Sequence, residues 1–423
     1  MDSHITGWVP VHRYAKRSCR NVPCTLKAAK LEDREITILS IVEQCGIMFV
    51  CLHFEEVWKF ASLTPVVSRF NPSFPSEFGR ETFTQIALAD TLRFAKFEHI
   101  VLVADILELD VVASRFGCTS VTACAVVLAR LATKDRYHKL AGTLCLDWSP
   151  SKLCKVFNAC IVHILHRFGS VVSFNSGLVT SACSEEYVSK ARGALKDCSL
   201  AKLACIYPSS HDTIRTIPAF AAFISRLSKC ALLMDGTFIA TCRPKNADDT
   251  VQNAMYCGHH KAHGLVYQGL VSLDGMLVSA FGPFLGSTHD SAILQQSRLF
   301  ERIDELGGQR VSVLGDKGYC HTNPRLVVPT KTRTGTHCLS CLFIMINHLF
   351  VYCAGMPSHE KAMNRIISCV RQPVEWMFKI VKETWPHLDD RKLLRVQDNC
   401  SVQAKVTTAC LLTNIRTCLI GHN

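Results

Sequence analysis

The sequence predicts a two-part protein in which a mostly helical segment precedes a mixed α/β domain. Its 423 residues favour two or three domains. Between about residues 81 and 223 apolar residues recur at helical spacing, whereas from Ala231 the pattern changes to short strands. Asp274-Gly275 marks a tight hairpin turn between two of them. The predicted parts are a basic arm and unassigned segment (1–70), a helical domain (71–225) and an α/β domain (226–423).

The helical segment contains two well-marked helices. Residues 119–133 are apolar at helical spacing. A second helix begins at Ser149-Pro150, because Ser is a favoured N-cap and Pro suits the first helical position. The segment 137–147 between them is short. This order is compatible with a DNA-binding helix-turn-helix and also with an ordinary helical bundle, since no basic recognition face is visible.

The α/β domain is predicted from its alternation of strands and helices. A short apolar strand ends at Asp235, and a later one ends near Asp316. Pro373 interrupts the last predicted helical region. The expected strands are 231–234, 263–273, 276–284 and 311–314, and the expected helices are 289–299 and 359–382.

Charge and cysteine content limit which partners and which cellular compartment the protein is expected to have. The formal net charge of +12 suits a polyanion such as DNA. Residues 1–30 hold six Lys or Arg against one acid, so this arm could contact DNA, direct nuclear import or be a solvated tail. The 23 cysteines show no disulfide-like spacing, which favours a reducing compartment. The apolar runs 38–52 and 338–353 are too short to span a membrane. We expect a nuclear protein without a membrane partner.

Three acids could carry metal chemistry. Asp235 and Asp316 each follow a short apolar strand, and Glu375 lies on a later helix that could pack beside them. Convergent carboxylates suit Mg²⁺, which prefers oxygen ligands. Two such ions activate an attacking hydroxyl and stabilise the leaving oxygen in phosphodiester cleavage. Spacing alone is weak support, because most Asp residues at strand ends are solvated turn residues.

Five short motifs occur in a specific order along the second part of the chain. They are MDGT from Met234, GHHKAH from Gly258, GSTHDS from Gly286, GDKGY from Gly315 and VEW from Val374. Together, over about residues 231–416, they resemble the DDE superfamily endonuclease domain of PIF/Harbinger transposases and their domesticated nuclease relatives. The resemblance implies an RNase H-like catalytic domain, DNA as substrate and a two-metal mechanism that uses Mg²⁺ or Mn²⁺.

The resemblance also assigns roles to individual residues. It implies that Asp235, Asp316 and Glu375 are the catalytic acids that bind metal, with Asp290 as a further acid that also serves as a metal ligand. Because Asp290 opens a helix, an N-cap or helix-dipole role is an equal alternative. Positions expected near the site, where His and Lys could contact phosphate, are His260, Lys261, His263, Lys317 and Tyr319.

A zinc cluster of Cys257, His259, His260 and His263 is a rival interpretation. If these residues form a strand, alternate side chains point to opposite faces, so His260 would face away from the others. We therefore prefer the carboxylate site.

Two features depart from the family pattern. Asp316 and Glu375 are 375 − 316 = 59 residues apart, whereas such transposases place these acids roughly in the mid-thirties apart. Residues 334–355, a stretch of 22 residues without Asp, Glu, Lys or Arg, would account for the difference as an insertion or retained intron, since 59 − 22 = 37. Pro373 lies two residues before Glu375, so either a new helix begins there or the catalytic helix is damaged.

The predicted function is that of a metal-dependent DNA endonuclease or transposase. The alternative is a catalytically decayed, domesticated descendant that binds DNA or a protein. A regulator that acts through the helical region would need a recognition helix that is not evident. A separate DNA-binding partner protein and a homo-oligomer both remain open.

Overall fold

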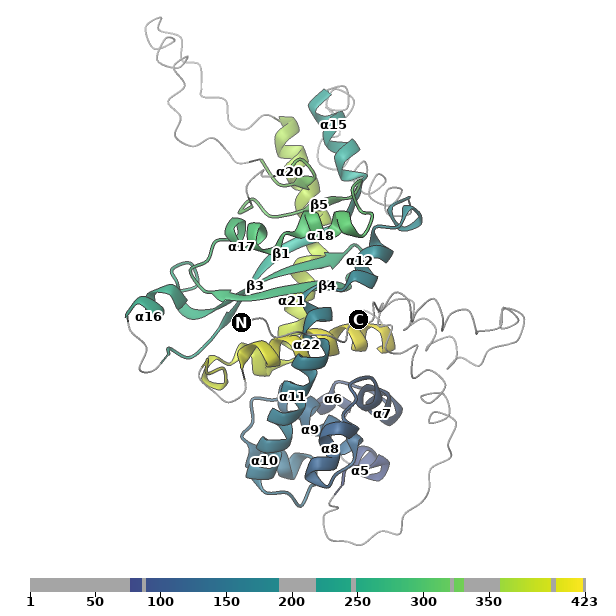
Figure 1. Ribbon diagram of the computed structural model, residues 1–423, viewed down its shortest axis with the longest axis vertical. Helices are drawn as coiled ribbons and strands as arrows, with labels where there is room; N and C mark the ends of the chain where they lie inside the picture. The colour runs from purple at the N-terminus through teal and green to yellow at the C-terminus, as the bar shows by residue number, and fades with distance from the viewer. Residues whose placement is uncertain are drawn as a thin grey trace, which may run out of the picture.

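The computed structural model describes residues 77–85, 89–189, 218–244, 249–319, 323–330, 358–396 and 401–420. A mixed sheet with helices on both faces forms one end of the molecule, and a helical bundle forms the other (Figure 1). Helix α22 (Val402–Ile420) lies between them. The mixed α/β architecture agrees with the predicted RNase H-like fold. The proposed insertion 334–355 lies outside the described residues.

The bundle is built around helix α9 (Ser120–Ala132), in which nearly every side chain is buried. Helix α11 (Pro150–Ser173) begins as predicted, since the Ser149 hydroxyl accepts a hydrogen bond from the Lys152 amide at 3.2 Å. The other elements are α5 (Arg80–Gln85), α6 (Ala89–Leu92), α7 (Phe97–Ile106), α8 (Asp110–Ala113), η2 (Ser114–Phe116), α10 (Tyr137–Thr143) and α12 (Ser176–Ala182).

Helix α11 joins the bundle to the sheet. Its apolar stripe packs against α9 at one end and against α22 and strand β4 at the other. It is therefore a core helix, although the stretch 150–182 is long and apolar enough to cross a membrane. The exposed positions of α11 do not form a basic stripe, which favours the bundle over a helix-turn-helix reader. They are Pro150, Ser151, Lys155, Val162, His166, Arg167 and Ser170.

The sheet is centred on strand β1 (Cys230–Ala240), which pairs antiparallel with β3 (Ala262–Ser272) and parallel with β5 (Ser312–Leu314). Strand β6 (Leu326–Val327) extends the parallel side. On the other side, β3 pairs with β4 (Leu277–Leu285) and β2 (Tyr256–Cys257), both antiparallel. The hairpin prediction is confirmed, because the chain turns between β3 and β4 at Gly275, whose φ of 87° suits glycine.

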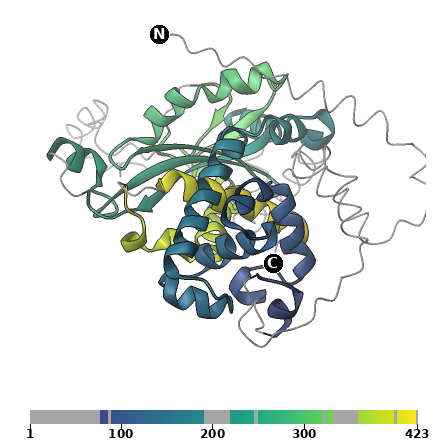
Figure 2. The same ribbon diagram turned by 60° about the horizontal axis from the view of Figure 1, so that its bottom comes forward.

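Side chains alternate between the two faces of the sheet, and helices cover both faces (Figure 2). Leu232 and Met234 belong to the core beneath α17 (Asp290–Ser297) and α18 (Leu299–Glu305). Leu233 belongs to the opposite core. That face is covered by α20 (Ser358–Val370), α21 (Gln372–Thr384) and α22. The remaining elements are α15 (Pro218–Leu227), α16 (Asp249–Met255), η3 (Pro386–Asp389) and η4 (Arg391–Leu393).

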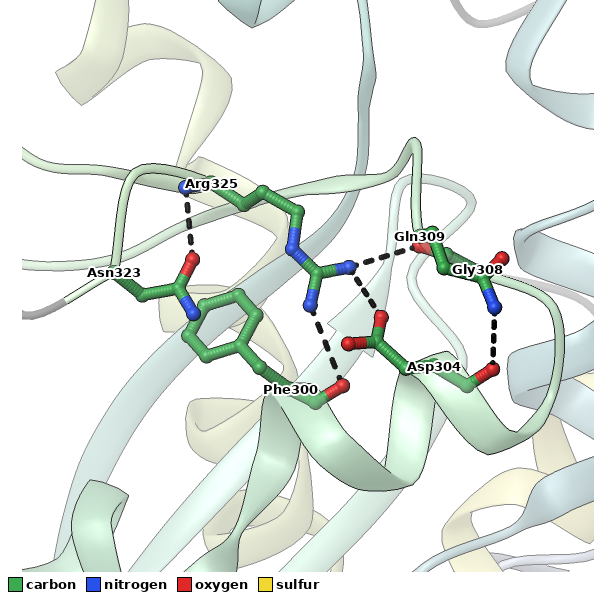
Figure 3. Close-up of polar contacts among 6 residues, drawn as sticks. All are labelled: Phe300, Asp304, Gly308, Gln309, Asn323 and Arg325. Carbon is green, nitrogen blue, oxygen red and sulfur yellow. Dashed lines mark hydrogen bonds and ion pairs between the residues drawn. The ribbon is translucent and has the colours of Figure 1, made fainter.

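Arg325 anchors the loop that leads into β6 (Figure 3). Its Nη1 atom lies 2.7 Å from Oδ1 of Asp304 and donates to the carbonyl oxygen of Gly308 at 3.1 Å. Its Nη2 atom donates to the carbonyl oxygen of Phe300 at 3.4 Å. One guanidinium thus ties β6 to α18, and β6 in turn pairs with β5, the strand that leads to Asp316.

Candidate active site

Asp235 lies within β1, and Asp316 lies two residues beyond the end of the neighbouring parallel strand β5. The prediction that Asp235 follows a short strand was wrong, because β1 continues to Ala240 by pairing with β3. Strand β5, however, ends at Leu314, which pairs with Leu233 of β1. Beyond that pair the edge of β1 is open, and Asp316 lies in this opening. The carboxyl end of a parallel strand is a common place for a site in α/β sheets.

A buried arginine bridges the two aspartates. Nη1 of Arg371 donates to Oδ1 of Asp316 at 2.8 Å, and Nη2 lies 3.2 Å from Oδ1 of Asp235. The Arg371 side chain is only 7% exposed. Both aspartate side chains therefore point toward one position occupied by positive charge.

Asp290 approaches the site from the other side of β1. A Cβ placed on Gly236 would lie 2.8 Å from its Oδ1, and one placed on Gly318 would lie 3.0 Å from its Oδ2. The two glycines therefore leave the space that the Asp290 carboxylate fills. Asp290 is the first residue of α17, but His289 occupies the N-cap position, so the N-cap alternative was wrong. Its place in the first turn remains favourable for a negative charge.

The pKa values of the acids at the site are shifted by burial and by neighbouring negative charges. Burial raises the pKa of Asp235 to about 6, although the Arg371 charge and the Gly236 amide lower it. The negative charges of Asp316 and Glu375 raise the pKa of Asp235 further. Burial and the charge of Asp316 also raise the pKa of Asp290. Burial and neighbouring negative charge thus disfavour the ionised forms of Asp235 and Asp290, so a cation close to them would stabilise their carboxylates.

Glu375 lies in the first turn of α21 and is exposed. It is near enough to Asp235 to raise the pKa of that residue. Helix α20 ends at Val370 and α21 begins at Gln372, with Pro373 in its first turn. A new helix therefore begins at this proline and Glu375 lies on an intact helix, because a proline there breaks no interior hydrogen bond.

The histidines of the GHHKAH motif lie away from the carboxylates. Asp235 pairs with Gly269, whereas His263 lies six residues before Gly269 on β3, about 20 Å away. Residues 258–261 form a turn, and the ring of His260 stacks on Phe238 at 4.3 Å between centroids. The structure thus places His260, Lys261 and His263 near the end of the sheet where β1 finishes and β3 begins, and not at the acids. His263 contacts the Tyr256 ring at 5.4 Å.

Lys317 and Tyr319 differ in accessibility. Lys317 is exposed next to Asp316. Tyr319 is 1% exposed and belongs to the core beneath α17 and α18. Burial strongly raises the pKa of its hydroxyl. Tyr319 therefore supports the loop from below and is out of reach of a phosphate in solvent.

Sequence reasoning missed Arg371. It lies four residues before Glu375, a spacing that places two helical side chains on one face. That spacing was the available signal. The burial of a charged residue, which shows that it has a specific partner, is visible only in the structure.

The donors suit a divalent ion in type. Asp235, Asp290, Asp316 and Glu375 offer carboxylate oxygens, the ligands that Mg²⁺ prefers. Among the described residues, however, no three His, Cys, Asp or Glu side chains are arranged to hold one metal ion. The Arg371 guanidinium takes the position between Asp235 and Asp316. The oxygen donors therefore fit a divalent ion, but the Arg371 guanidinium fills the space between Asp235 and Asp316.

An acid within β1, a second acid just beyond the neighbouring strand β5 and two acids on helices thus gather at one place on a mixed sheet. Comparison with known families agrees. Residues 234–414 match the family model described as DDE superfamily endonuclease, and this part of the chain is a domain of that superfamily. The matched range contains Asp235, Asp290, Asp316 and Glu375. Neither a curated protein nor a solved structure matches the chain.

Proposed function

We propose that this chain is a metal-dependent DNA endonuclease or transposase of the PIF/Harbinger kind. The observation that carries the proposal is that Asp235 of β1 and Asp316, just beyond β5, contact the same Arg371 guanidinium, with Asp290 against Asp316 and Glu375 within electrostatic reach of Asp235. These four acids would hold two Mg²⁺ or Mn²⁺ ions. Bound ions would supply an activated oxygen nucleophile and stabilise the leaving oxygen of a phosphodiester.

The protein's own residues would position the DNA. Next to Glu375 on α21, Trp376 is 58% exposed and Lys379 is exposed. Aromatic rings stack on bases and lysines pair with phosphates. We infer that DNA crosses the carboxylates and continues over the exposed residues of α21.

A metal-dependent nicking assay tests the proposal. Full-length protein should nick supercoiled DNA with Mg²⁺ or Mn²⁺ and lose this activity with chelator. Asp316→Asn should abolish nicking while DNA binding persists, because the change removes a metal ligand and no phosphate contact. Asp147→Asn, an exposed acid of the bundle, is the matched control and should nick normally.

The outcome separates the proposal from its rival. Folded wild-type protein that binds DNA in a salt-sensitive manner but never nicks it would be a decayed descendant. In that case the domain family would stand and the enzymatic function would not.

We also propose that the protein acts in the nucleus. The support is the basic segment of residues 1–30, which lies outside the described residues. A fluorescent fusion with and without this segment tests the proposal, since equal distributions of the two would contradict it.

A further inference from the structure

We propose that Arg371 is an internal cation that holds Asp235 and Asp316 together when no divalent ion is bound, and that an ion must displace its guanidinium in order to bind. Arg371 would thus be a positioning residue that sets the metal affinity of the site. The inference rests on the proposed metal-dependent function.

The geometry is that of a bridge between two acids. Nη1 contacts Asp316 and Nη2 contacts Asp235, so each acid receives one nitrogen instead of the paired contact that an arginine makes with a single carboxylate. Nε of Arg371 is buried and has no hydrogen-bond partner among the described residues. A buried donor without a partner costs free energy. The guanidinium is therefore held by its ion pairs with the two carboxylates, although one of its N–H groups has no hydrogen bond.

The acids are more open to solvent than the arginine. The side chains of Asp235 and Asp316 are 23% and 35% exposed, against 7% for Arg371. A hydrated ion can therefore reach the carboxylates from outside. It would draw on the same Oδ1 atoms that the guanidinium contacts, and two cations sharing these oxygens would repel each other. Binding of the ion therefore favours departure of Arg371.

The exchange must replace one cation with another. Asp235 interacts unfavourably with Asp316 and Glu375, and Asp290 interacts unfavourably with Asp316. Without Arg371 or an ion, like charges would face one another in a partly buried site. The guanidinium therefore preserves the paired arrangement of the acids until an ion takes its place.

The location of Arg371 allows it to move independently of Glu375. Arg371 is the N-cap residue of α21, in the joint between α20 and α21. Glu375, by contrast, is one turn before Phe378, whose ring packs on the sheet at Gly269. The long arginine side chain can leave through rotation of its own bonds while Phe378 keeps α21 in place.

Mn²⁺ titration of the full-length protein tests the inference. Calorimetry would measure the Mn²⁺ affinity, and thermal unfolding would measure stability without metal. Arg371→Gln should lower the Tm without metal and bind Mn²⁺ roughly tenfold more tightly, the fold-change expected when one charge-assisted hydrogen bond no longer competes. Arg371→Lys, which keeps the charge but loses the planar fork, should have an intermediate affinity.

A matched control separates competition from general destabilisation. Arg167 of α11 pairs with Glu108 through contacts of 2.7 and 2.9 Å, far from the site in sequence and fold. Arg167→Gln should also lower the Tm but leave the Mn²⁺ affinity unchanged.

Each other outcome is decisive. Equal Mn²⁺ affinity in wild type and Arg371→Gln, or weaker binding in the variant, would overturn the displacement inference while the metal site stands. Failure of every folded variant and of wild type to bind Mn²⁺ would remove the proposed function as well. If Arg371→Gln does not fold, Arg371→Lys decides: an affinity no tighter than that of wild type overturns the inference.

Discussion

Phe378 packs directly on Gly269, so that a Cβ added to this glycine would lie 1.9 Å from the ring. Gly269 is the cross-strand partner of Asp235, and Phe378 follows Glu375 by one helical turn. The absence of a side chain at position 269 therefore sets how closely the helix that carries Glu375 approaches the strand that carries Asp235.

Gly269→Ala should force Phe378 and α21 away from the sheet. Overpacking of this kind costs about 1–3 kcal/mol, and unfolding in urea would measure it. Phe378→Leu in the same chain should recover part of the loss. Gly142→Ala is the control, because a Cβ at that helical position meets no atom within 4 Å and should be neutral or slightly stabilising. Full stability of Gly269→Ala would show that the contact does not set the spacing.

Arg325→Met should destabilise the parallel edge of the sheet. It removes the ion pair with Asp304 and leaves the carbonyl oxygens of Gly308 and Phe300 without this donor. The expected loss is about 1–3 kcal/mol in the free energy of unfolding. Arg325→Lys should recover only part of it, because an ammonium cannot reproduce the planar fork. Equal stability of the Lys variant and wild type would contradict this explanation.

His387 should make stability depend on pH. It is 1% exposed, and burial followed by the charges of Arg130 and Lys405 lowers its pKa to about 2. With an ordinary pKa of 6.5, the unfolded chain binds more protons between pH 2 and 6.5. Stability should therefore fall as the pH drops below 6.5, by up to about 1.4 kcal/mol per pH unit, and this term vanishes above 6.5.

The matched comparison for this prediction is His387→Leu. The difference in unfolding free energy between wild type and His387→Leu should change with pH between 4.5 and 6.5 and stay constant above 7. Parallel pH profiles would show that His387 is not buried in its neutral form.

Trp376 should contribute to DNA binding and little to stability. Because its side chain is 58% exposed, Trp376→Ala should change the unfolding free energy by about 0.5 kcal/mol or less. Loss of stacking on one base would cost about 1–3 kcal/mol of binding, which is roughly a fivefold to hundredfold weaker Kd. Fluorescence polarisation with labelled DNA would measure it. Val162→Ala, at an exposed apolar position of α11, should not change the Kd; an unchanged Kd for Trp376→Ala would remove it from the DNA path.

The local elements were predictable because their signals are local. Ser149-Pro150 begins α11, Asp274-Gly275 turns between β3 and β4, and the strand before Asp316 is a short apolar run. The full length of β1 was not predictable in this way. Its second half, from Gly236 onward, is stabilised by pairing with β3, whose partner residues follow 24 to 32 residues later in the chain.

The order of the motifs was enough to select the candidate acids Asp235, Asp290, Asp316 and Glu375, because each lies in a short and specific pattern. Long-range packing decided how they meet. The end of β5 at Leu314 opens the edge of β1, Gly236 and Gly318 make room for Asp290, and Arg371 enters between two aspartates that are distant in sequence. The same packing moved Tyr319 into the core and the GHHKAH turn to the end of the sheet. Residue patterns record which groups are present, whereas burial and the balance of charge arise only when separate segments come together in space.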